Sequence, residues 1–167
     1  WFYSFVIDKG SDDGIQVEIT NDETDEMNGQ MIIQNGAIDI EVNSPDVKAL
    51  RSDSLMTING GTIKLEVTGD GSKGMTTDTD IYVDETVAPV NVNIHCTGGE
   101  YIDPADPTDT KKCHGINVTG NLTIMGGTFN ILSTGKKGKS IKVDGISKKA
   151  EGANVTTNPS YYFDFII

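Results

Sequence analysis

A repeat of 25 residues constrains this sequence more than any other feature. Three segments, Met31–Val42, Met56–Val67 and Leu122–Ser133, each hold a short apolar run, a glycine corner and a second run that alternates apolar and polar residues. Alternation at period two, with many β-branched residues, predicts half-buried β-strands rather than helices. A unit this short cannot bury its own apolar face, so successive units are expected to stack.

A second signature, a small residue followed by an apolar anchor, sets the length of the unit. The anchors are Ile15, Leu50, Met75, Ile116 and Ile141, at spacings of 35, 25, 41 and 25 residues. The two longer spacings equal the unit plus insertions, which fall near 20–30 and 97–112. Both insertions are polar and are predicted to be surface loops.

The predicted fold is all-β. We expect a single-stranded parallel β-helix of about five to six coils, one domain over 1–167. A β-sandwich is the alternative, but it would show turn signals every 8–12 residues or so without a fixed repeat. Aromatic residues crowd 1–7 and 160–167, and we expect these segments to be strands that cap the open ends. An aromatic platform for sugars is the other interpretation. The aromatic residues concerned are Trp1, Phe2, Tyr3, Phe5, Tyr161, Tyr162, Phe163 and Phe165.

Stacked repeats predict ladders of outward-facing side chains. Two residues before the anchors stand Asp13, Lys48, Lys73, His114 and Lys139. Directly after the anchors stand Gln16, Arg51, Thr76, Asn117 and Lys142. Three residues after the anchors stand Glu18, Asp53, Asp78, Thr119 and Asp144.

These ladders have two interpretations. Lys and Asp five residues apart could pair around a corner, which contributes little to stability. Alternatively, the cations line a groove for a repeating polar ligand, and a polysaccharide has that extended shape. The candidate ligand-binding residues are Lys48, Arg51, Lys73, His114, Lys139 and Lys142.

The charge of the chain limits the classes of molecule that it is expected to bind. It carries 25 acidic against 13 basic residues, and 22 of the acids fall within residues 1–110. Such a surface disfavours nucleic acid, and no apolar run is long enough to span a membrane. Acid clusters are either solvated surface or sites for calcium, which prefers carboxylate and carbonyl oxygens. The candidate metal ligands are Asp12, Asp13, Asp53, Asp78, Asp80, Asp103 and Asp106.

The two cysteines, Cys96 and Cys113, flank the second insertion. A disulfide would close the base of this loop and would suit an oxidising location; two free thiols are the alternative. A zinc site with His95 and His114 is the least favoured interpretation, because adjacent strand residues point to opposite faces.

Three stretches, Lys73–Met75, Lys112–Thr128 and Met56–Thr62, resemble one bacterial family. It is the carbohydrate-binding β-helix domain of secreted proteins from polysaccharide-degrading bacteria, and the resemblance covers roughly residues 8–145. It implies a right-handed parallel β-helix like that of pectate lyases, binding of acidic polysaccharide or cellulose, bound calcium, and a secreted or cell-surface location. The chain departs from the family pattern in its two insertions, in Ala49 and Ser140 where glycine is usual, and in its aromatic ends.

The predicted function is a non-catalytic module that binds polygalacturonate, pectin or a cellulose-like polysaccharide with the assistance of calcium. A structural or adhesive cell-surface module that binds a protein is one alternative. A calcium-dependent lyase is another, with Lys or Arg as the base. It is disfavoured because an Asp in most rungs opposes the lowered pKa that a catalytic lysine needs. The oligomeric state stays open.

Overall fold

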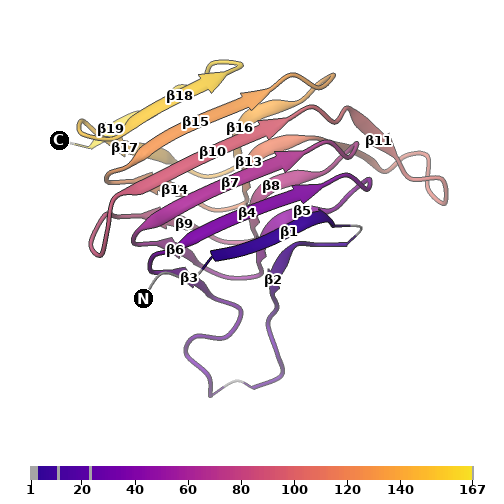
Figure 1. Ribbon diagram of the computed structural model, residues 1–167. Helices are drawn as coiled ribbons and strands as arrows, with labels where there is room; N and C mark the ends of the chain where they lie inside the picture. The colour runs from indigo at the N-terminus through magenta and orange to yellow at the C-terminus, as the bar shows by residue number, and fades with distance from the viewer. Residues whose placement is uncertain (1–3, 11, 23, 167) are drawn as a thin grey trace.

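The computed structural model describes residues 4–10, 12–22 and 24–166, and all regular elements in them are β-strands. Three parallel sheets dominate (Figure 1). Sheet A holds, in spatial order, β1 (Ser4–Gly10), β4 (Ala37–Val42), β7 (Gly61–Val67), β10 (Val90–Cys96), β15 (Thr128–Ser133) and β18 (Asn154–Asn158). Sheet B holds β2 (Ile15–Val17), β5 (Lys48–Ser52), β8 (Lys73–Thr77), β13 (His114–Val118) and β16 (Lys139–Val143). Sheet C holds β3 (Met31–Ile33), β6 (Met56–Ile58), β9 (Ile81–Val83), β14 (Leu122–Ile124), β17 (Ser147–Ala150) and β19 (Asp164–Ile166).

From β2 to β18 the chain visits these sheets in a fixed rotation of B, C and A, so each repeat adds one strand to each sheet. The anchors stack as predicted: Leu50 is paired with Met75, and Ile116 with Ile141, one repeat further along the chain in both cases. The predicted all-β class, the parallel pairing and the length of the repeat are confirmed.

The core lies between the three sheets and follows the alternation of the strands. In β7, Ile63, Leu65 and Val67 are fully buried, whereas Thr62 and Lys64 face solvent. Burying each large aliphatic side chain stabilises the fold by about 2 kcal/mol, which a single repeat could not achieve without neighbours.

Glycines at one corner let the chain turn from sheet C into sheet A. Gly36, Gly61 and Gly127 have φ angles of 111°, 104° and 98°. This left-handed region is costly for residues with a side chain. A Cβ on Gly61 would also lie 2.7 Å from the carbonyl oxygen of Gly36 in the neighbouring repeat.

The two insertions differ in structure. Residues 18–22 and 24–30, between β2 and β3, form no strand and extend away from the sheets (Figure 1). Asn28 holds this loop together, because its Oδ1 accepts a 2.7 Å hydrogen bond from the amide of Thr20. The second insertion is not the plain loop that its polar composition predicts: it contains an antiparallel hairpin, β11 (Glu100–Ile102) and β12 (Thr110–Lys112).

The first and last described strands lie at sheet edges, β1 in sheet A and β19 in sheet C. Tyr161 and Phe163 pack against the core, and their rings meet edge to face at 5.0 Å. Tyr162 is 88% exposed. Trp1, Phe2 and Tyr3 lie outside the described residues, so the predicted capping role of the ends stays a prediction. In the part of the chain that the structure describes, no helix is long and apolar enough to cross a membrane.

Candidate functional site

The predicted ladders lie on the outside of sheet B. Lys48, Lys73, His114 and Lys139 occupy equivalent positions on β5, β8, β13 and β16. Arg51, Thr76, Asn117 and Lys142 form the second ladder on the same four strands. Neighbouring rungs are separated by the strand spacing of about 4.8 Å. The register of these ladders is therefore confirmed.

A hollow of about 350 Å³ opens over β5, β8 and β13, and we call it the sheet-B groove. It is lined by Asp46, Lys48, Arg51, Lys73, Thr76, Asp78, Lys111 and Asn117. Sequence reasoning picks out four of these for ligand or metal binding: Lys48, Arg51, Lys73 and Asp78. It misses Asp46, which sits in the turn before β5, and Lys111, which comes from the hairpin of the second insertion.

Asp46 joins the hairpin to the groove. Lys111 donates a hydrogen bond to one carboxylate oxygen of Asp46, and the Nζ of Lys48 lies 3.3 Å from the other. Burial alone would raise the pKa of Asp46, but hydrogen bonds and charge from Lys111 and Lys48 hold that pKa below its usual value. The hydrogen bond from Lys111 to Asp46 also raises the pKa of Lys111. The hairpin thereby becomes one wall of the groove.

The third ladder is the set of residues three after the anchors. Its acids do not form the predicted pairs with lysines five residues earlier. Arg51 lies 3.1 Å from Asp53, and Lys142 lies 2.9 Å from Asp144. Both pairs join residues two apart, because side chains two apart on a strand share one face. Arg51 has a second partner in Asp13, at 3.7 Å.

Lys73 differs from the other cations of the groove. Its Nζ donates a hydrogen bond to the carbonyl oxygen of Gly71, and no carboxylate among the described residues forms an ion pair with it. Burial lowers the pKa of Lys73 to about 8, an effect that the charges of Lys48 and Lys111 reinforce and that of Asp46 opposes. Lys73 thus carries a partly desolvated charge that an incoming anion could neutralise.

Asp78 directly follows β8, at the end of the strand opposite to Lys73. Between these two residues, the second ladder has Thr76 on β8, whereas it has the cations Arg51 on β5 and Lys142 on β16. Over the residues that the structure describes, no ion pair or hydrogen bond to the Asp78 carboxylate is present. Thr76 instead accepts a 3.2 Å hydrogen bond from the side-chain amide of Asn117.

The remaining candidate ligand-binding residues do not line the groove. His114 is 5% exposed, and its Nδ1 accepts a hydrogen bond from the amide of Lys139. Burial, with the charges of Lys73, Lys142 and Lys139, lowers the pKa of His114 to about 4. Lys139 lies in a separate hollow beside Pro159 and Tyr161.

The candidate metal ligands are dispersed. The described part of the chain holds no group of three or more His, Cys, Asp or Glu side chains that could bind a metal ion. Most of these acids accept hydrogen bonds from backbone amides instead. Asp12 bonds the amide of Asp13, Asp13 that of Lys48, Asp53 that of Ile19, Asp80 that of Asn121, Asp103 that of Ala105 and Asp106 that of Thr108. Calcium binding stays a prediction.

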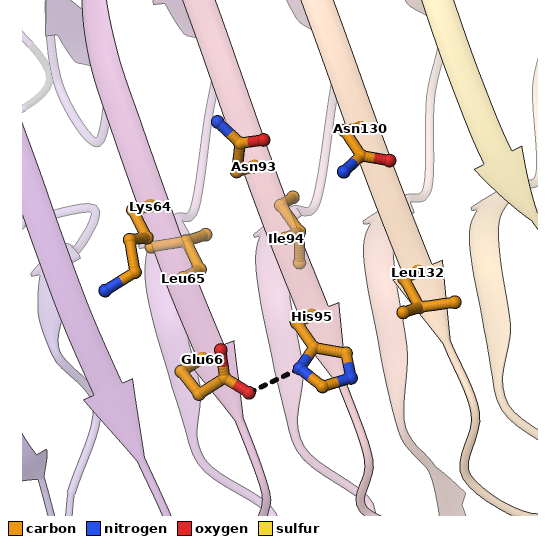
Figure 2. A pocket seen from close by; sticks show the side chains of 8 residues that line it. All are labelled: Lys64, Leu65, Glu66, Asn93, Ile94, His95, Asn130 and Leu132. Carbon is orange, nitrogen blue, oxygen red and sulfur yellow. Dashed lines mark hydrogen bonds and ion pairs between the residues drawn. The ribbon is translucent and has the colours of Figure 1, made fainter.

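A second polar surface lies on the outside of sheet A and was missed by sequence reasoning (Figure 2). Its hollow of about 370 Å³ spans β7, β10 and β15. Asn93 and Asn130 lie side by side on β10 and β15, with Lys64 next in the same row on β7. In the next row, Glu66 bonds His95 at 2.5 Å, and Leu132 follows His95. The signal was available, because the outward positions of these alternating strands are polar apart from Leu132.

Comparison with known proteins identifies one family. A family model described as carbohydrate-binding domain-containing protein matches residues 4–152, most of the chain. No curated protein and no solved structure matches this chain.

Proposed function

Because the chain belongs to the family of carbohydrate-binding domain-containing proteins, we propose that it binds an acidic polysaccharide, such as polygalacturonate, in the sheet-B groove. One observation carries this proposal: Lys73 presents an ammonium group in the middle of the groove, and no described carboxylate pairs with it. A uronate carboxylate would supply the missing partner, and such charge-assisted bonds are the stronger ones.

The neighbouring groups suit the rest of a sugar unit. Thr76 and Asn117 have hydroxyl and amide groups that can both donate and accept hydrogen bonds, as sugar hydroxyls require. Lys48 and Arg51 are already paired with acids, so they add little net attraction. The polymer would run across the strands, where equivalent rungs repeat every 4.8 Å or so.

We further infer that the sheets wind as one right-handed parallel β-helix. Crossovers between parallel strands of one sheet are right-handed in nearly all proteins, and the rotation through sheets B, C and A repeats along the chain.

Calcium would act as a bridge rather than in a site made by the protein alone. Asp78 supplies one carboxylate at the groove, and a bound uronate would supply further oxygens, as calcium needs more ligands than Asp78 offers. The polymer's negative charge would otherwise be repelled by a chain of net charge −12.

The test is retention on immobilised polygalacturonate, with calcium and after treatment with EDTA. We expect calcium-dependent retention that is weakened about tenfold by Lys73→Met, because the ligand's carboxylate loses its charged partner. Asp78→Asn should lose the calcium dependence. Lys148→Met makes the same chemical change on sheet C and should bind like the unmodified chain.

Other results would redirect the assignment. Retention unchanged by Lys73→Met would place the acidic ligand elsewhere. No retention under any condition would favour the adhesive module that binds a protein. An absorbance from unsaturated uronate in the same wells would establish a lyase.

Sheet A supports a second candidate ligand, a neutral cellulose-like polysaccharide. The observation in its favour is that the side-chain amides of Asn93 and Asn130 have no hydrogen-bond partner within the described ranges. Leu132 and the His95 ring add apolar surface beside them (Figure 2). An acidic polymer is less suitable here, because Glu66 lines the hollow and Asp39 already pairs with Lys64, the lysine of this hollow.

Native gels containing hydroxyethyl cellulose separate the two surfaces. Asn93→Ala combined with Asn130→Ala should weaken binding of the neutral polymer about tenfold and leave binding of polygalacturonate unchanged. Lys73→Met should do the reverse. If both polymers respond to the same variant, the chain has one saccharide site rather than two.

A further inference from the structure

Cys96 and Cys113 occupy a defined corner between sheets A and B. Cys96 ends β10 in register with Val67 of the preceding repeat and Ser133 of the following one. Cys113 precedes β13 at the position that Ser72 and Gly138 hold in those same repeats.

The two positions of this corner face each other. In the last of these repeats, a Cβ on Gly138 would lie 2.5 Å from the hydroxyl oxygen of Ser133. In the earlier repeats the corner joins Val42 to Val47 and Val67 to Ser72. The cysteines are fully buried free thiols, and each thiol perturbs the pKa of the other.

The β11–β12 hairpin is inserted at this same corner. In the other three repeats the paired positions are joined by the short connections 43–46, 68–71 and 134–137, whereas the whole segment 97–112 joins Cys96 to Cys113. This connection includes Lys111, which contacts Asp46 in the wall of the groove. We propose that Cys96 and Cys113 form a disulfide that closes the base of this hairpin.

The chemistry is a thiol–disulfide exchange with a small disulfide such as oxidised glutathione. The thiolate of Cys113 attacks one glutathione sulfur and expels the other as a thiolate. The thiolate of Cys96 then attacks the Cys113 sulfur of the mixed disulfide and expels the second glutathione. In total the two thiols give up two protons and two electrons, and oxidised glutathione becomes two glutathione molecules.

The two thiols shift each other's pKa in the native fold. The interaction with Cys96 lowers the pKa of Cys113, and the charge of Lys73 adds to this effect while burial opposes it; the same interaction and burial raise the pKa of Cys96. Because both thiols are buried, we expect the bond to form during folding or after opening of the hairpin rather than by direct attack on the native state.

The test is to refold the reduced chain in a glutathione redox buffer and count its free thiols in denaturant. We expect none per chain, a mass about 2 Da below the reduced form as two hydrogens leave, and no linked dimer on a non-reducing gel. Thermal unfolding should move up by about 6–12 °C on oxidation, given the loop length and the size of the chain.

The matched control is Cys96→Val combined with Cys113→Ser, which reproduces the Val67–Ser72 pair of the preceding repeat. It should unfold like the reduced chain with or without oxidant. Two free thiols after refolding, disulfide-linked dimers, or a lower unfolding temperature on oxidation would each overturn the proposal. The thiol count and mass are measured on the unmodified chain, so they decide the matter even if the variant does not fold.

Discussion

The pH dependence of polygalacturonate binding tests the role of Lys73 most directly. Its pKa of about 8 follows from burial and from neighbouring cations, and its ammonium group has no ion-pair partner among the described residues. If the ligand's carboxylate binds the charged form, binding raises this pKa, and affinity falls once the free group loses its proton. The affinity should therefore be flat below pH 7 and fall above pH 8.

The size of the effect follows from the fraction of Lys73 that is charged. With a pKa of about 8, that fraction drops from roughly nine-tenths at pH 7 to one-tenth at pH 9. Binding should weaken about tenfold over this range, or about 1.4 kcal/mol. The polymer's carboxylates stay ionised throughout, so they contribute no slope.

The assay is titration calorimetry with oligogalacturonate at constant ionic strength, because salt screens the same interaction. Lys73→Arg supplies the matched control, since a guanidinium stays charged across the range. We expect this variant to bind with no slope, and Lys73→Met to bind weakly with no slope. A parallel decline in the unmodified chain and in Lys73→Arg would refute the assignment, because the titrating group would then lie elsewhere.

Three further predictions concern stability. His114 is neutral in the fold with a pKa of about 4, whereas the unfolded chain takes up its proton near pH 6.5. Stability is therefore complete above that pH and is lost as pH falls, by about 2 kcal/mol at pH 5. Urea unfolding of His114→Asn should lack this loss, and an equal loss in the variant would contradict the reasoning. Leu65→Ala, at a fully buried site, should cost about 3 kcal/mol in the same assay; Lys64→Ala on the exposed face of the strand is its control and should cost under about 0.5 kcal/mol. Gly61→Ala should cost at least about 2 kcal/mol, because its φ of 104° and its contact with Gly36 both oppose a side chain; a near-neutral result would show that the corner can relax.

The alternation of apolar and polar residues and the repeat were enough to predict the strands and their stacking. The alternation in Gly61–Val67 decides which side chains are buried, since successive residues of a strand point to opposite faces. The period of the repeat then places Lys48 beside Lys73 and Arg51 beside Thr76 without any knowledge of the tertiary structure. These ladder positions are where sequence reasoning located the candidate site.

The tertiary structure decided which of these positions can act. Composition predicts a solvated loop for the second insertion, but its hairpin folds back so that Lys111 reaches Asp46, far away in the sequence. The same ladder buries His114 and leaves Lys73 without a carboxylate partner in the described part of the chain.

The physical reason is the range of the interactions involved. A repeat determines where each backbone position lies, because hydrogen bonding between strands is periodic. The partners of a long charged side chain depend on whatever neighbouring repeats and loops bring within about 4 Å, the reach of an ion pair. The period of the repeat and the alternation of the strands therefore determined the sheets and the ladders by themselves. Only the packed repeats and the folded hairpin decided that Lys73 lies in a groove with no described carboxylate to pair with, and that Cys96 faces Cys113.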